Sequence, residues 1–141
     1  MLNAFKIGCY KYFKTIQMSD LIYKSESFAI IGKCMEVHNQ LGSGFLEIVY
    51  KDALAYEFKL AGIPFEREKH YEVKYKGIVL PHQFIADFVV YDKIILEVKG
   101  IKNLPNEITA QVINYLKVSN NKLGLLINFG EAQLNYKRIV F

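Results

Sequence analysis

Two neighbouring strand-like segments that carry charged residues constrain this chain most. Residues 84–91 and 94–99 are short runs of apolar, β-branched and aromatic residues, which favour strands. The second run begins with three apolar residues that cover both faces, so we expect that strand to be central and buried. Buried charges need partners, yet Asp87, Glu97 and Lys99 lie within these runs. A divalent cation such as Mg²⁺ would be a suitable partner for the two carboxylates, because carboxylate oxygens are hard ligands.

The length of the loop between these segments decides whether the two carboxylates meet. Side chains alternate along a strand, so Glu97 and Lys99 share one face. A three-residue loop over residues 91–93 would put Asp87 opposite Glu97, whereas a two-residue loop would pair Asp87 with Val98 and separate the carboxylates. A metal site therefore requires the longer loop or a bulge. The alternative is that Asp87 hydrogen-bonds locally and that Glu97 and Lys99 are an ordinary same-face pair; these residues alone leave both interpretations open.

Three helices and further strands are expected around this pair. Ser25 or Ser27 is placed to cap a first helix that ends near Gly42, with Phe28 and His38 on its apolar stripe. We expect His38 to be a hydrogen-bonded core residue. The other expected elements are helices over residues 45–61 and 105–119, two strands within 65–79, a buried strand over 123–129 and an edge strand over 136–141.

Several polar residues on these elements have ordinary structural explanations. Glu47 lies in the first turn of the second helix, where the helix dipole and a pair with Lys51 would account for it. Gln111 and Tyr115 share a face of the third helix, as a polar and aromatic pair covering the sheet would. Glu68 is expected on a solvated strand face.

Six motifs in order resemble one family of proteins. They are residues 37–42, GFLEIVY at 44–50, Asp87, EVK at 97–99, Gln111 with Tyr115 four residues later, and GLLINFG at 124–130. Over roughly residues 19–141 the chain resembles the PD-(D/E)XK nuclease-like superfamily, and within it the small bacterial and archaeal GxxExxY family. The superfamily's proline before the first aspartate is absent, because Ala86 precedes Asp87.

The resemblance implies an α/β fold of three layers, a mixed central sheet of four or five strands flanked by helices. It also implies a metal-dependent phosphodiesterase of the nuclease type, which hydrolyses nucleic acid, DNA or RNA, with Mg²⁺ or with Mn²⁺ as a substitute. Such hydrolysis needs a water made nucleophilic near neutral pH and compensation of charge on the phosphoryl oxygens, and divalent ions supply both.

The resemblance assigns roles by position. Asp87, Glu97 and the Val98 carbonyl would bind the metal, and Glu47 would complete the acidic site through water. Lys99 would orient or activate the attacking water and offset phosphate charge. The two residues implied in placing the nucleic acid are Gln111 and Tyr115.

Composition bounds the remaining choices. A chain of 141 residues with 52% hydrophobic residues suits one globular domain. We expect residues 18–141 to form it and residues 1–17, with three lysines and no acid, to be an unstructured basic arm or a start assigned upstream of Met18. The whole chain carries 18 basic and 14 acidic residues; subtracting the three lysines of the arm leaves 15 and 14, so net charge gives little support to nucleic-acid binding.

Two function classes follow, a metal-dependent nuclease and a non-enzymatic module that binds nucleic acid or protein on the same fold. The complete set of Glu47, Asp87, Glu97 and Lys99 favours the first. No apolar run is long enough to span a membrane, and Cys9 and Cys34 lack metal-binding spacing, which is consistent with reduced thiols in the cytoplasm. The choice of DNA or RNA, endo- or exonuclease action, and oligomeric state, a homodimer included, stay open.

Overall fold

The computed structural model describes residues 21–141, so the expected basic arm lies outside the described residues. In chain order the elements are α2 (Lys24–Leu41), α3 (Glu47–Leu60), β1 (Phe65–Tyr75), β2 (Ile78–Val90), β3 (Ile94–Lys99), α4 (Asn106–Ser119), β4 (Leu123–Asn128) and β5 (Asn135–Val140). Within the described part, no helix is both long and apolar enough to cross a lipid bilayer.

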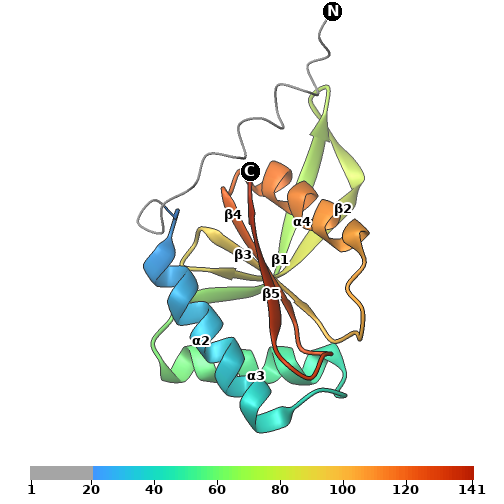
Figure 1. Cartoon of the computed structure of the whole chain (residues 1–141). Helices are drawn as coiled ribbons and strands as arrows, with labels where there is room; N and C mark the ends of the chain where they lie inside the picture. Colours follow the sequence, from blue (N-terminus) through green and yellow to red (C-terminus); the bar gives the residue numbers. More distant parts are fainter. Residues whose placement is uncertain (1–20) are drawn as a thin grey trace, which may run out of the picture.

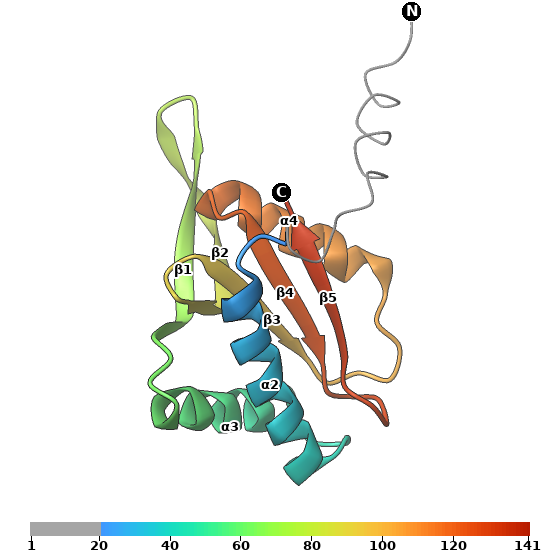
Figure 2. The same cartoon turned by 60° about the vertical axis from the view of Figure 1, so that its left-hand side comes forward.

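One five-stranded mixed sheet, in the order β1-β2-β3-β4-β5, organises the molecule. Strands β3 and β4 are parallel, and every other neighbouring pair is antiparallel. A parallel pair needs a crossover connection, which α4 provides. Helices α2 and α3 cover one face of the sheet and α4 lies on the other (Figures 1 and 2). The expected three-layer α/β fold is therefore confirmed, with β3 central and β5 at an edge.

The core has two parts, one on each face of the sheet. On the first face, side chains of β3 and β4 pack with Ile30 and Cys34 of α2 and with Leu54 and Phe58 of α3. On the second face, the sheet packs with Val112, Tyr115 and Leu116 of α4. All six residues of β4 and the first five of β3 are buried. The central strands are thus enclosed on both sides, as their continuous apolar runs predict.

The start of α2 differs from the sequence prediction. Ser25 and Ser27 lie inside the first turn, and the residue at the cap position, Tyr23, makes no capping hydrogen bond with its side chain. Ser27 Oγ instead donates to the Tyr23 carbonyl over 2.8 Å and accepts from Arg138 of β5 over 2.6 Å. Phe28, placed on the apolar stripe by its spacing, is 82% exposed. The prediction of a serine cap was wrong because the helix begins at Lys24, before both serines.

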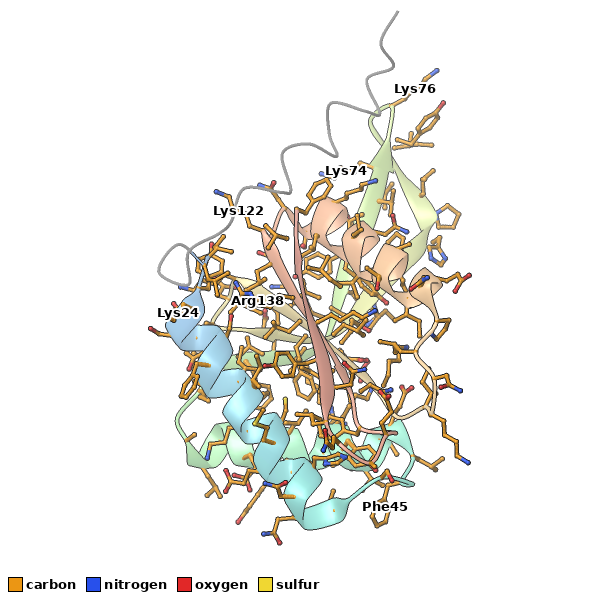
Figure 3. All side chains as sticks on the ribbon, in the orientation of Figure 1. Lys24, Phe45, Lys74, Lys76, Lys122 and Arg138 are labelled. Atoms are coloured by element: carbon orange, nitrogen blue, oxygen red, sulfur yellow. The ribbon has the colours of Figure 1, made fainter. Side chains whose placement is uncertain are left out.

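Strands β1 and β2 form a long hairpin that extends beyond the rest of the sheet (Figures 1 and 2). Residues 78–90 are one strand, although the sequence predicted two, one ending near residue 79 and one beginning at residue 84. The register of the hairpin shifts between Glu72 and Lys74, across from Pro81, and such an irregularity tolerates a residue without an N–H. Lys76 lies at the tip of the hairpin, at the other end of the molecule from Phe45 (Figure 3).

Asn128, at the end of β4, joins the loops that follow β3 and β4. It is fully buried, and its amide Nδ2 donates to the Ile101 carbonyl over 2.7 Å and to Glu131 Oε2 over 3.0 Å. Its Oδ1 accepts from the backbone N–H groups of Ile101 and Gly130, each over 3.1 Å. His38 Nε2 lies 3.0 Å from the Glu131 carbonyl, so that nitrogen carries the proton and His38 is the hydrogen-bonded core residue expected. These bonds fix the backbone directly after Lys99.

Replacing Asn128 with Ala should destabilise the chain by about 2–4 kcal/mol, because it leaves the N–H and carbonyl of Ile101 and the N–H of Gly130, all partly buried, without these partners. Asn135→Ala is a matched control, since Asn135 also donates to Glu131 Oε2 over 3.0 Å but is exposed. Urea unfolding of the three proteins measures the difference. Equal losses in both variants would contradict the role given to Asn128.

Candidate active site

The β2–β3 hairpin ends its backbone pairing at the two acidic residues. Pairing runs through Val90 with Ile94, Val89 with Ile95 and Phe88 with Leu96. This register leaves residues 91–93 as the loop, so the three-residue loop is confirmed and Asp87 comes next to Glu97. Strands β2 and β3 separate beyond the pair of Phe88 with Leu96. We call this point, where Asp87 and Glu97 lie next to that last pair, the fork.

Each carboxylate at the fork accepts a backbone hydrogen bond from the opposite strand. Asp87 Oδ2 accepts from the Val98 N–H over 2.8 Å, and Glu97 Oε1 accepts from the Asp87 N–H over 3.0 Å. Buried N–H groups need acceptors, and the separating strands offer these two none of their own. Asp87 therefore does hydrogen-bond locally, as one interpretation of the sequence held, and the same bonds bring the two carboxyl groups together.

The environment of Glu97 favours its protonated form. Glu97 is only 3% exposed. Burial, followed by the negative charge of Asp87, raises the pKa of Glu97 from its ordinary 4.5 to about 8, against a smaller lowering by the Asp87 N–H and the Lys99 ammonium. The fork thus holds two carboxyl groups whose mutual repulsion an added cation would relieve.

Lys51 of α3 supplies a cation to Asp87 that the sequence did not predict. Its Nζ lies 3.1 Å from Asp87 Oδ1 and 2.9 Å from Glu68 Oε1. Burial lowers the pKa of Lys51, but its hydrogen bonds and charge interactions with Glu68 and Asp87 outweigh burial and raise that pKa overall. The expected pair of Lys51 with Glu47 is not among the ion pairs of the described residues, because Lys51 points to the sheet instead.

Glu68 reaches this site because β1 and β2 reverse their faces beside the fork. Phe88 packs on the face covered by α2 and α3, whereas Ala86, two residues earlier, packs on the α4 face. Phe65 and Tyr71 of β1 lie on opposite faces in the same way. Glu68 lies between them with φ 54°, a left-handed conformation unusual for a residue other than glycine. The solvated face expected for Glu68 is therefore half right: it is 47% exposed but bound to Lys51.

Lys99 and Glu47 approach the same end of β3. Lys99 is the last residue of β3, and its charge acts on Glu97. Among residues 21–141 no carboxylate lies within 4.0 Å of its ammonium. Glu47 is the first residue of α3, and its Cγ lies 3.6 Å from where a Cβ on Gly100 would be. The N-terminal turn of α3 therefore borders the backbone that follows Lys99.

The GFLEIVY motif has a structural explanation in Tyr50. Its hydroxyl donates to the Gly42 carbonyl over 2.7 Å and accepts from the Phe45 N–H over 3.2 Å. Its ring stacks on Phe129, directly after β4, with the centroids 4.5 Å apart. Tyr50 thus ties the loop before α3 to the end of β4 and holds Glu47, one turn earlier, in place. Phe45 is 46% exposed at this loop (Figure 3).

Of the two residues implied in substrate placement, Tyr115 is within reach of the charges of the acids. Burial, then the charges of Glu97, Asp87 and Glu68, raise the pKa of Tyr115 to about 12. Its ring also meets Phe84 edge to face, with the centroids 5.5 Å apart. Gln111, one turn earlier on α4, is exposed. The structure therefore places Tyr115 within the field of the fork and leaves Gln111 open to solvent.

The ligand atoms at the fork are of the chemical type that a divalent cation prefers. Asp87 and Glu97 present hard oxygen atoms side by side, and Lys51 already occupies Asp87 Oδ1 as a cation would. Within residues 21–141, however, no three acidic, histidine or cysteine side chains gather as a ready metal cluster. Glu47 does not complete such a group in this conformation, and a cation at the fork would draw on two carboxylates plus backbone or water oxygen.

The fold and this site define a three-layer α/β protein with paired carboxyl groups and a lysine at the end of its central strand. A family model for the PD-(D/E)XK nuclease superfamily matches residues 24–139. The chain belongs to that superfamily. The crystal structure of SSO0001 is similar, with a TM-score of 0.55 and 19% identity over 99% of this chain and 77% of that one, which shows a shared fold. No curated protein is significantly similar to this chain.

The raised pKa of Glu97 predicts a specific loss of stability with rising pH. Between 4.5 and about 8 the folded chain keeps a proton that the unfolded chain has released. Glu97 therefore lowers the free energy of unfolding as pH rises through this range, by at most about 1.4 kcal/mol per pH unit. Glu97→Gln removes this titration and should lose less stability from pH 5 to pH 8.

Urea unfolding at the two pH values, with a chelator present, measures this effect. Glu72→Gln, at an exposed position of β1, is the control and should follow the wild type. If the wild type and Glu97→Gln lose the same stability between pH 5 and pH 8, the protonation assigned to Glu97 is wrong.

Proposed function

We propose that this chain is a divalent-metal-dependent nuclease that hydrolyses phosphodiester bonds of nucleic acid, with Mg²⁺ as its metal and Mn²⁺ as a substitute. The observation that carries the proposal is the contact of Asp87 with Glu97 at the fork, beside Lys99. Membership of the nuclease superfamily supports it. The GFLEIVY motif supports a place in the GxxExxY family.

The metal would be held by Asp87, Glu97 and the Val98 carbonyl, with Glu47 acting through water. When bound, it would make water more acidic and offset negative charge on the phosphoryl oxygens. The fold prepares these ligands in advance, since the Val98 and Asp87 N–H groups hold both carboxylates at the end of a buried sheet. Preorganised charges need no rearrangement when the reaction occurs.

Lys99 would act on the phosphate and on the attacking water. Its ammonium is a compact charge on a flexible stem, and no acidic side chain of the described residues pairs with it. It is therefore available to a phosphoryl oxygen at the fork. Tyr115, and Gln111 from the exposed side of α4, would contact the nucleic acid beside it.

Divalent metal should stabilise the folded chain. A ligand that binds only the folded state raises the melting temperature in proportion to the logarithm of its concentration, so millimolar Mn²⁺ or Mg²⁺ should raise it by a few degrees. Asp87→Asn should abolish most of the increase. Asp92→Asn, in the β2–β3 loop, removes one charge away from the fork and should keep it. An unchanged melting curve for the wild type would count against a metal site.

Lys99→Ala should lower cleavage by about 10²–10³-fold while leaving folding and nucleic-acid binding nearly intact, because this lysine acts mainly on the transition state. The assay uses single- and double-stranded DNA and RNA with Mn²⁺. Lys102→Ala, three residues further on and exposed, is the matched control and should cleave as the wild type does.

Equal activity of the wild type and Lys99→Ala would indicate a contaminant or a different site. No cleavage of any substrate, together with tight binding of nucleic acid or protein, would instead support the non-enzymatic binding module.

A further inference from the structure

Lys51 makes the most enclosed ion pair of the described residues. Its side chain is 13% exposed and that of Asp87 is 14% exposed, whereas every other ion pair of residues 21–141 has at least one partner more than 20% exposed. An enclosed ion pair is weak evidence of a stabilising role, because desolvation offsets much of the attraction between its charges. Its position on a residue of the fork therefore calls for a different explanation.

Lys51 has two acceptors of unequal kind. Asp87 Oδ1, 3.1 Å away, belongs to a carboxylate whose other oxygen is fixed by the Val98 N–H. Glu68 Oε1, 2.9 Å away, belongs to a half-exposed side chain. The lysine can therefore give up Asp87 and keep Glu68 without acquiring a new partner. Its ammonium is a point charge on a flexible stem, which suits a short movement of this kind.

We propose that Lys51 is a positioning residue that holds Asp87 when the fork has no metal and withdraws to Glu68 when a divalent cation takes Asp87 Oδ1. This inference rests on the proposed function and concerns the same site. The charges are compatible with it: Lys51 and Glu68 neutralise each other, and Asp87 together with the deprotonated form of Glu97 would balance one divalent cation.

This movement of Lys51 predicts opposite effects on cation affinity when Lys51 or Glu68 is removed. Without Lys51, the cation no longer competes with an ammonium group for Asp87 Oδ1, so it should bind more tightly. Without Glu68, Lys51 has Asp87 as its one remaining acceptor, so the cation should bind more weakly. Moreover, Glu68 should act through Lys51, so its removal should have little effect once Lys51 is absent.

Calorimetric titration of the full chain with Mn²⁺ alone tests this scheme. Lys51→Met should bind about tenfold more tightly than the wild type, and Glu68→Gln several-fold more weakly. In the double variant, the effect of Glu68→Gln should largely vanish. Lys59→Met, on the same helix and exposed, is the control for a lost positive charge and should bind as the wild type does.

Additive effects of the two changes would show that both residues act as distant charges, and would overturn the inference. So would unchanged or weaker Mn²⁺ binding by a folded Lys51→Met. If that variant does not fold, Lys51→Gln, which keeps polar contacts without the charge, carries the same expectation. Mn²⁺ binding that needs Asp87 but ignores Lys51 would overturn this inference alone. Absence of binding in both the wild type and the Lys51 variant would overturn the proposed metal site as well.

Discussion

The separation of β2 from β3 after Phe88 and Leu96 is the constraint on which the site depends. It leaves the N–H groups of Asp87 and Val98 without partners between these two strands, in a partly buried region. A carboxylate from the opposite strand satisfies each of them. The same two bonds place two acidic groups in contact, which is costly for the fold unless a proton or a cation is shared between them. A structural requirement of the backbone thereby produces a group of atoms suited to a metal.

The rest of the molecule keeps this end of the sheet in one arrangement. Asn128 fixes the backbone after Lys99, and the Cα of Gly130 lies so close to Ile101 that a Cβ there would be 2.3 Å from its backbone. Tyr50 fastens the start of α3 to the end of β4 by stacking on Phe129. Three segments distant in sequence therefore meet at the fork with little freedom. Catalytic groups held in this way need less reorganisation during a reaction.

Local patterns predicted the central strand from the apolar run before Glu97, whereas the three-layer fold was implied by the resemblance to the nuclease superfamily. Strand alternation showed that a three-residue loop would bring Asp87 to Glu97 but left the loop length open, and the register of β2 and β3 settles it. Lys51 and Glu68 escaped prediction for a physical reason. Glu68 reaches the site through a left-handed backbone at a residue that is not glycine, and through a reversal of faces that both strands share. Neither the left-handed backbone nor the reversal of faces can be recognised from the order of the residues.

The central claim is that the fork is a divalent-cation site in which Lys51 and the metal share Asp87. Its most direct test is a crystal structure of the full chain with Mn²⁺, with diffraction recorded at the manganese absorption edge. The account predicts an anomalous peak in contact with the carboxylates of Asp87 and Glu97, with the Lys51 ammonium beside Glu68 alone. At saturating Mn²⁺, a peak elsewhere, or no peak with Lys51 still bound to Asp87, would contradict it.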